Sequence, residues 1–199
     1  VPDEYRLAFL PVDTKEGKQY LHWMQLSMDF ARENREKMLL AVKAILEKWI
    51  GKYTDLQLEF AGDINCHHNY AALENHFGKN VWVHRKGAVR AGNGELAVIP
   101  GAMGSYSYVV MGKGNPDSFC SSSHGAGRQY SRKGAMQAFT CEEVILDLQK
   151  TGVILGKKNK SDVAEESRFA YKNIEEVMDN QTDLVVPVKR LKTIGVVKG

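Results

Sequence analysis

A regular apolar stripe between residues 21 and 49 sets the first limit on the fold. Its members recur at three- and four-residue steps: Leu21, Met24, Met28, Ala31, Met38, Val42, Ile45 and Trp49. This spacing places the side chains on one face of an α-helix. Asp13 followed by Glu16 resembles a capping box, with Asp in place of the usual Ser or Thr, and Gly51 is a typical helix end. We therefore predict one long helix from Asp13 to Gly51, with its apolar face turned to the core.

Shorter segments after this helix alternate or carry turn signals. Leu56, Leu58 and Phe60 alternate with polar residues, as in a strand with one buried face. Further strands are predicted at residues 81–90, 96–100, 106–111 and 185–198, and helices at 140–150 and 174–179. Thr140 with Glu143 forms a capping box for the first of these helices. There is no internal repeat, low-complexity tract or obvious linker.

Composition and charge exclude few functions. With 199 residues, 43% hydrophobic and 26% charged, the chain has ordinary globular composition. A net charge of +3 permits an anionic partner, but dedicated non-specific nucleic-acid binders are usually more basic. Cys66, Cys120 and Cys141 have no disulfide-framework spacing, which favours a reducing compartment and predicts a cytoplasmic location. No apolar run approaches a membrane span, and no signal peptide opens the chain.

The stretch from Ser121 to Arg128, Ser-Ser-Ser-His-Gly-Ala-Gly-Arg, carries the chemistry we weigh most heavily. Gly125 and Gly127 can adopt positive φ, so successive N–H groups can converge on an anion, and Arg128 adds a planar fork for a phosphate. His124 beside such a cradle is a candidate nucleophile towards phosphorus. The alternative is a glycine-rich turn with a surface histidine, and a short motif alone leaves both open.

A second group of polar residues, Asp63-Ile64-Asn65-Cys66-His67-His68-Asn69, contains candidate metal ligands. Adjacent side chains on an extended backbone point in opposite directions, so at most one of His67 and His68 serves a given site. A closed site needs three or four ligands, and no second cluster with matching spacing occurs.

Two further motifs lie between these groups. Arg85-Lys86-Gly87-Ala88 is by default an exposed basic edge that discourages aggregation, or alternatively a phosphate-binding pair. Pro100-Gly101-Ala102-Met103-Gly104 is a tight turn, which we expect to form one pocket with the His124 stretch.

These motifs, with the terminal Val196-Val197-Lys198-Gly199, occur in the order and approximate spacing of the RtcB family, which the whole chain resembles. The resemblance implies an α+β fold with mixed or antiparallel sheets and flanking helices. It also implies a GTP- and manganese-dependent RNA ligase used in tRNA splicing or RNA repair. Such enzymes join RNA ends bearing a 3′-phosphate or 2′,3′-cyclic phosphate to 5′-hydroxyl ends, and an accessory activator protein is a further partner to consider.

The resemblance also assigns roles to residues. His124 matches the histidine that attacks the α-phosphorus of GTP and carries GMP, and His68 matches a manganese ligand. The positions that match guanylate contacts are His68, Asn69, Pro100, Gly101, Ala102, Met103, Ser107, His124, Gly125, Ala126, Gly127 and Lys198. Tyr171 is expected to wall the base pocket.

The chain departs from the family pattern in two ways. It looks like the C-terminal portion of a single catalytic domain, residues 1–199, because the family's other manganese ligands and an Asn-His guanylate segment lie upstream of its first residue. Ala102 stands where relatives commonly have serine.

Two alternatives to a ligase therefore stay open. One is a non-catalytic module that binds RNA or nucleotide. The other is a metal-dependent phosphohydrolase that uses His68 and His124 at a metal.

Overall fold

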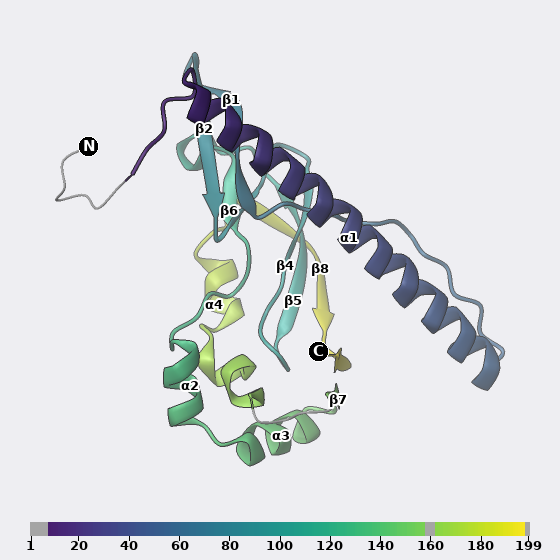
Figure 1. The fold of residues 1–199 in the computed structure, drawn as a ribbon. Coiled ribbons are helices and arrows are strands. Elements are labelled where there is room, and N and C mark those ends of the chain that lie inside the picture. Colours follow the sequence, from purple (N-terminus) through teal and green to yellow (C-terminus); the bar gives the residue numbers. More distant parts are fainter. Residues whose placement is uncertain (1–7, 158–161, 198–199) are drawn as a thin grey trace. The chain divides into compact units, whose positions relative to one another are not determined.

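A computed structural model describes residues 8–157 and 162–197 of the chain. The chain is an α+β protein, as expected, with helices and small, mostly antiparallel sheets (Figure 1). It divides into two compact units, Val1–Tyr70 and Ala71–Gly199, which are described separately. No helix in the described ranges is long and apolar enough to cross a membrane.

The first unit consists mainly of α1 (Lys15–Tyr53). The hydroxyl of Thr14, rather than a carboxylate of Asp13, caps this helix by accepting a hydrogen bond from the Gly17 amide at 3.0 Å. The helix also continues past Gly51 to Tyr53, where the Thr54 amide donates to the Ile50 carbonyl. The predicted helix is confirmed, and its predicted ends are wrong by one or two residues.

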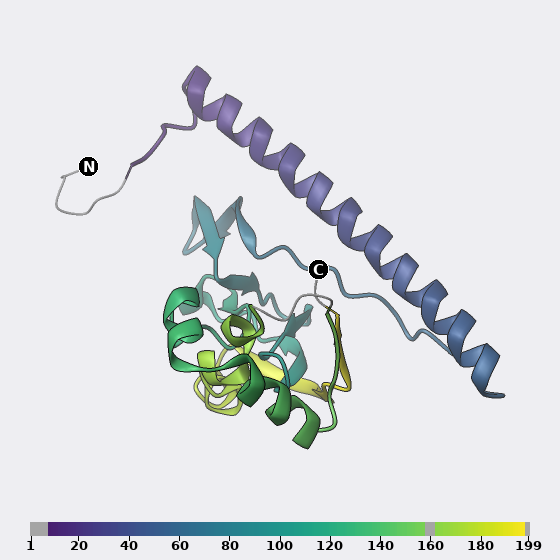
Figure 2. The ribbon, with the colours of Figure 1, turned by 60° about the horizontal axis from the view of Figure 1, so that its bottom comes forward.

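The apolar face of α1 is not turned to a core within this unit. Met38, Val42 and Ile45 are 51–60% exposed, so the prediction of a core-facing stripe is wrong for the structure described here. The physical reason lies in the rest of the unit. Residues 54–68 run back beside α1 as an extended segment with no strand, contrary to the prediction for residues 56–60 (Figure 2). They contact the helix largely through polar pairs such as Lys43–Asp63, whose Nζ and Oδ1 atoms are 2.6 Å apart.

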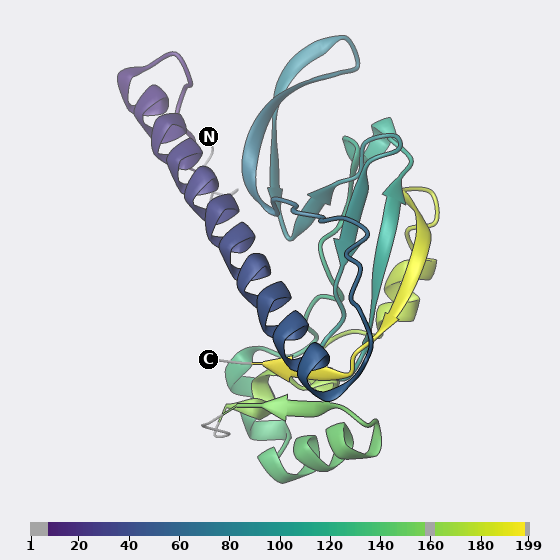
Figure 3. The same ribbon diagram turned by 90° about the vertical axis from the view of Figure 1, so that its right-hand side faces the viewer.

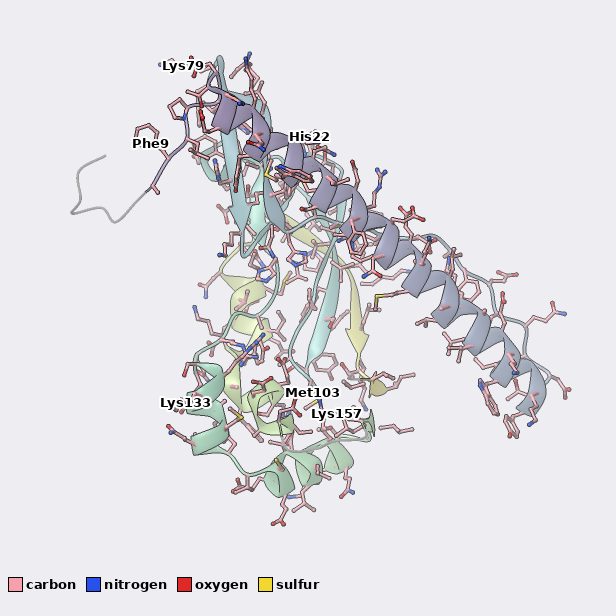
Figure 4. All side chains as sticks on the ribbon, in the orientation of Figure 1. Phe9, His22, Lys79, Met103, Lys133 and Lys157 are labelled. Carbon is pink, nitrogen blue, oxygen red and sulfur yellow. The ribbon has the colours of Figure 1, made fainter. Side chains whose placement is uncertain are left out.

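The second unit contains four small sheets. Strands β1 (Asn69–His76) and β2 (Lys79–Lys86) form a hairpin, which Figure 4 shows with Lys79 at its tip. Strand β3 (Ala88–Arg90) pairs with β6 (Ser121–Ser123) in antiparallel orientation. Strand β5 (Tyr106–Gly112) lies between β4 (Leu96–Ile99) and β8 (Val185–Lys192), antiparallel to both. The short strands β7 (Ile154–Gly156) and β9 (Gly195–Val197) pair in parallel.

The strand predictions are confirmed in part. The alternating segments at 96–100 and 106–111 form β4 and β5, joined by the Pro100–Gly104 turn. The segment 81–90 is interrupted at Gly87, whose φ of +78° ends the extended run. The segment 185–198 is divided between β8 and β9, and its last residue, Lys198, lies outside the described residues.

Helices α2 (Arg132–Ala138) and α3 (Cys141–Lys150) lie beyond one end of the β4-β5-β8 sheet, as Figures 1 and 3 show. The capping box of Thr140 and Glu143 at α3 is confirmed, and so is α4 (Ile174–Asp179). Three short 3₁₀ turns complete the unit: η2 (Pro116–Ser118), η3 (Val163–Glu166) and η4 (Arg168–Ala170). A buried cluster joins the α3 end to the Pro100–Gly104 turn: Met103, Val144, Leu148, Val153, Val163 and Ala164.

Candidate functional site

His124 follows β6 directly, and its surroundings are set by Gly87. The His124 amide donates to the Gly87 carbonyl oxygen at 3.3 Å. A Cβ atom built on Gly87 would lie 3.7 Å from both Nδ1 and Cε1 of the His124 ring, so the imidazole packs against the glycine backbone. The φ of +78° at Gly87 is a conformation that other residues rarely adopt. The glycine of the Arg-Lys-Gly-Ala motif therefore shapes one wall of the His124 site.

The Pro100–Gly104 turn contacts the loop that follows His124. The Pro100 carbonyl oxygen accepts a hydrogen bond from the Ala126 amide at 3.1 Å. A Cβ on Gly125 would approach the same oxygen to 3.1 Å, so this position favours a residue without a side chain. The structure thus brings together two of the predicted motifs that are separated by about twenty residues in the sequence.

Within that turn, the predicted contact residues differ in what they can offer a ligand. The Gly101 amide donates to the Ser107 hydroxyl oxygen at 3.2 Å, which fixes the turn against β5. Ala102 and Met103 are each 8% exposed, and Met103 packs in the cluster beside α3 (Figure 4). Because these two side chains face the core, the turn can meet a ligand mainly through its backbone, and through Pro100 and Gly101.

The loop after His124 is only partly the phosphate cradle that the sequence predicted. Gly127 has a φ of +72°, as expected, but Gly125 is not among the glycines with positive φ. The Ala126 amide is already hydrogen-bonded to Pro100. The expected convergence of successive N–H groups is therefore wrong for Ala126, because its amide binds the neighbouring turn, and Gly125 does not adopt the positive φ that the convergence requires.

The guanidinium of Arg128 binds neighbouring groups of the protein itself. Its Nη1 donates to the Glu165 carbonyl oxygen at 2.6 Å, and its Nη2 donates to Glu166 Oε1 at 2.8 Å. The guanidinium also lies over the Tyr171 ring, 4.6 Å from its centroid. The predicted phosphate fork therefore serves first to hold the loop against the segment around η3.

Tyr171 lies next to the His124 loop, where its strand bridge pairs it with Arg128. Its hydroxyl donates to Glu166 Oε2 at 2.8 Å. Burial, together with this carboxylate, raises the pKa of Tyr171 to about 12, so the phenol stays protonated at neutral pH. The ring, and not the hydroxyl, is the part available to wall a neighbouring pocket.

Three buried hydroxyls near this loop have no hydrogen-bond partner in the described part of the chain: those of Ser122, Ser123 and Ser167. Ser122 and Ser123 immediately precede His124, and Ser167 forms a backbone bridge with Met103 of the turn. An unpartnered buried hydroxyl costs about 1–3 kcal/mol. The sequence pattern does not mark these serines as ligand contacts. Ser122 and Ser123 point to opposite faces of β6, so at most one of their hydroxyls lies on the side of His124 and is a candidate for binding a polar ligand there.

Sequence reasoning also missed the burial of Arg85. Its side chain is 1% exposed and forms two hydrogen bonds with Glu74, at 2.6 and 3.0 Å. This contact is the main reason that the pKa of Glu74 falls to about 2. The default prediction of an exposed basic edge is therefore wrong for Arg85, although Lys86 is exposed. The sequence signal for this burial was Val83, an apolar residue two positions earlier, which lies on the same face of the strand as Arg85 and is also buried.

The residues from Cys66 to Tyr70, which include the predicted metal ligand His68, belong to the first unit, whereas His124 belongs to the second. His67 Nδ1 lies 3.5 Å from Arg35 Nη2 of α1. Burial and the positive charge of Arg35 lower the pKa of His67. His68 and Asn69 are exposed.

Manganese requires several donors, and the residues described here do not supply them. No group of three or more His, Cys, Asp or Glu side chains that could hold a metal occurs within residues 8–157 and 162–197. The described part of this chain therefore does not by itself fit a manganese site, and we derive no chemical step from the metal.

Comparison with known proteins agrees with this arrangement of motifs. The sequence model of the family described as tRNA-splicing ligase RtcB matches residues 1–199. The chain is 40% identical over 197 residues to the RNA-splicing ligase RtcB of Escherichia coli K12, covering 97% of this chain and 47% of that protein. It is 35% identical over 221 residues to the tRNA-splicing ligase RtcB of Methanococcus maripaludis, and this match covers 100% of this chain and 45% of that protein. It is 35% identical over 219 residues to the RNA-splicing ligase RtcB of Mycobacterium tuberculosis, and this match covers 100% of this chain and 49% of that protein.

The chain spans about half the length of the curated relatives it matches. The family match extends from its first residue to its last, and so includes the His124 loop, the Pro100 turn and Gly87. The chain therefore belongs to the RtcB family of tRNA-splicing ligases.

Proposed function

We propose that the protein carrying this chain joins RNA ends bearing a 3′-phosphate or 2′,3′-cyclic phosphate to 5′-hydroxyl ends, with GTP as the co-substrate and His124 as the nucleophile. The observation that carries the proposal is the contact between two motifs around one imidazole. The loop after His124 is hydrogen-bonded to the Pro100–Gly104 turn, and Gly87 lies against the ring. The relatives named as RNA-splicing ligases support this assignment.

The first step is attack of an unprotonated His124 nitrogen on the α-phosphorus of GTP. A nitrogen–phosphorus bond forms, the bond from the α-phosphorus to the bridging oxygen breaks, and pyrophosphate leaves with the electron pair. A 2′,3′-cyclic phosphate must first be opened by water, which breaks the bond from phosphorus to the 2′-oxygen and leaves a 3′-phosphate monoester. A phosphate monoester is a poor electrophile, because hydroxide is a poor leaving group. Transfer of GMP from His124 to the terminal RNA phosphate would give that phosphate a better leaving group, which an incoming 5′-hydroxyl can displace.

The residues near His124 support this step in different ways. Gly87 lies against the His124 imidazole, and its carbonyl oxygen accepts the hydrogen bond from the His124 amide. One of the Ser122 and Ser123 hydroxyls, which point to opposite faces of β6, is a candidate donor to the guanylate, and the backbone of the Pro100–Gly104 turn is a candidate surface for it. Lys198 and His68 are proposed as guanylate and metal ligands on the family resemblance alone.

The test uses two pairs of RNA oligonucleotides with the full polypeptide that carries this chain, manganese and GTP. One pair has 3′-phosphate and 5′-hydroxyl ends, and the other has 3′-hydroxyl and 5′-phosphate ends. We expect joining of the first pair only, dependence on GTP, and loss of joining in His124→Ala with an unchanged melting temperature. Joining of the second pair, or equal joining in His124→Ala, would refute the proposed function.

A non-catalytic nucleotide-binding module is the second candidate function for these 199 residues taken alone. The observation in its favour is that no three metal-binding side chains gather among the residues that the structure describes. Ligation by the purified 199-residue chain, without added polypeptide, would exclude this candidate.

A further inference from the structure

Arg85 contacts the segment that leads into His124. Its Nε donates to the Ser121 hydroxyl at 3.0 Å, and its Nη2 donates to the Phe119 carbonyl oxygen at 2.9 Å. The same guanidinium holds Glu74 of β1 through both Nη atoms. Arg85 itself lies on β2, two residues before Gly87, the residue that accepts the His124 amide. One buried side chain thus connects the two backbone segments that meet at His124.

The segment held by Arg85 has an unusual backbone. Phe119 and Cys120 both have positive φ, +53° and +50°, although neither is glycine. Such conformations persist only where the surroundings fix them. The Cys120 amide donates to the Asn115 carbonyl at 2.9 Å, and the Cys120 carbonyl accepts from the Ala91 amide at 2.7 Å. With the Arg85 bond to Phe119, these contacts determine where β6 begins.

The start of β6 in turn determines the position of His124. Strand β6 pairs with β3 over three residues, from Ser121 opposite Arg90 to Ser123 opposite Ala88. The Ser123 amide also donates to the Gln181 side chain at 3.1 Å. A short strand with three paired residues depends on contacts at its ends, so a change at Phe119 or Ser121 is expected to shift the imidazole.

The charge of Arg85 is balanced by Glu74, whose side chain is 9% exposed. Glu74 Oε1 also pairs with Arg90 Nη1 at 3.1 Å, and Oε2 lies 3.0 Å from His76 Nε2. The His76 ring packs on the Phe119 ring, with centroids 5.0 Å apart. A buried charge without its partner is strongly unfavourable. Glu74 is therefore needed to keep the Arg85 guanidinium in place between β2 and β6.

We propose that Glu74 and Arg85 are positioning residues that hold the His124 imidazole in line with the phosphorus it attacks. This inference rests on the proposed function of His124, and neither residue touches the reacting atoms. Arg85 acts through Phe119, Ser121 and the end of β2, and Glu74 acts through Arg85. Displacements of about 1 Å at a reacting group can lower a rate on the order of a hundredfold.

The experiment compares Arg85→Lys with the double variant Glu74→Leu/Arg85→Met in the full polypeptide that carries this chain. Lysine keeps the charge but lacks the planar fork that reaches Glu74, Phe119 and Ser121 together. Replacing both partners by apolar residues removes the unpaired buried charge, so the double variant guards against simple unfolding. Val110→Ala, at a buried position of the central strand β5, is the control for lost stability without a change near β6.

Two measurements distinguish a displaced His124 imidazole from a loss of folding stability. We expect the rate of GMP attachment to His124 to fall at least tenfold in Arg85→Lys and in the double variant, with the Kd for GTP changed less than twofold. We expect carbethoxylation of His124 by diethyl pyrocarbonate, followed by peptide mass spectrometry, to change at least threefold in both. Val110→Ala should lower the melting temperature and leave both rates unchanged.

Rates that follow the melting temperature across all variants, including Val110→Ala, would overturn the positioning role. Rates of GMP attachment and carbethoxylation equal to those of wild type in Glu74→Leu/Arg85→Met would also overturn it. If wild-type protein carries no GMP on His124, the proposed function fails, and the carbethoxylation rates still decide whether Arg85 positions this ring.

Discussion

The amide of His124 donates to the carbonyl oxygen of Gly87, and the imidazole packs against the same glycine. The two residues come from different motifs, and their contact joins the end of β2 to the end of β6. Because Gly87 has positive φ, its place beside His124 depends on the absence of a side chain.

Replacement of Gly87 by alanine is expected to affect both stability and chemistry. An alanine at a φ of +78° is strained, which we expect to lower the free energy of unfolding by about 1 kcal/mol. Its Cβ would meet the His124 ring at 3.7 Å, an ordinary van der Waals contact. The strained backbone at residue 87 is instead expected to shift the carbonyl that accepts the His124 amide, and so to lower the rate of GMP attachment severalfold. Thermal unfolding and labelling with GTP measure the two effects.

Gly78→Ala is the matched control for this substitution. Gly78 has a similar φ of +74° and lies in the β1–β2 turn, with nothing within 4 Å of an added Cβ. It should show a similar loss of stability and an unchanged labelling rate. Equal loss of labelling in both variants would mean that the contact between Gly87 and His124 has no chemical role.

The acid sensitivity of the second unit should depend on Glu74. Its folded pKa of about 2 lies below the ordinary glutamate value of 4.5, mainly because Arg85 donates hydrogen bonds to the carboxylate. A lowered folded pKa adds stability above the unfolded pKa, and this contribution is lost as pH falls from about 4.5 towards 2. The difference corresponds to at most about 3 kcal/mol.

Denaturant unfolding at pH 7, 4 and 3 measures this contribution. Glu74→Gln should be less stable than wild type at pH 7, and the gap between the two should narrow as the pH falls. A gap that stays constant from pH 7 to pH 3 would show that the ion pair with Arg85 does not set the acid sensitivity.

Tyr171 should contribute through its ring. Its hydroxyl is hydrogen-bonded to Glu166, so Tyr171→Phe is expected to leave the Kd for GTP within about twofold of wild type and to cost about 1 kcal/mol of stability. Tyr171→Ala should weaken GTP binding about tenfold, because the ring that we expect to wall the base pocket is removed. Equilibrium binding of a fluorescent GTP analogue distinguishes the two variants. Weaker binding in Tyr171→Phe would indicate that the hydroxyl contacts the nucleotide.

Lys198 remains a prediction from the family resemblance, since it lies outside the described residues. A charged hydrogen bond to a base carbonyl is worth roughly 1.5–3 kcal/mol, so Lys198→Ala should raise the GTP requirement about tenfold to a hundredfold. It should also reduce the preference for GTP over ATP. Unchanged nucleotide dependence would show that the lysine does not contact the base.

The sequence predicted the parts of the fold that depend on local signals. Thr140 and Glu143 form their capping box, and the strands predicted at 96–100 and 106–111 form β4 and β5 on either side of the Pro100 turn. The hydrogen bond from Ala126 to Pro100 brings the turn and the His124 loop together, and the pocket that we expect them to form stays a prediction.

The failures depend on contacts that local patterns do not specify. Leu58 alternates as in a strand, but residues 54–68 have no ladder partner among the residues of the first unit that the structure describes. Arg85 looks like a solvated cation in sequence, and its burial depends on Glu74, eleven residues earlier on the paired strand. The conformation of Gly125 depends on the Pro100 carbonyl, which motif spacing does not reveal.

The central claim is that His124 carries the nucleotide, and peptide mapping after reaction with GTP labelled at the α-phosphate tests it most directly. The full polypeptide that carries this chain, incubated with manganese and then digested, should show one GMP on the peptide containing His124. The adduct should be acid-labile and stable in alkali, as a phosphoramidate is, and it should be absent from His124→Ala. Label on a lysine or on His67, or undiminished label in His124→Ala, would contradict the account.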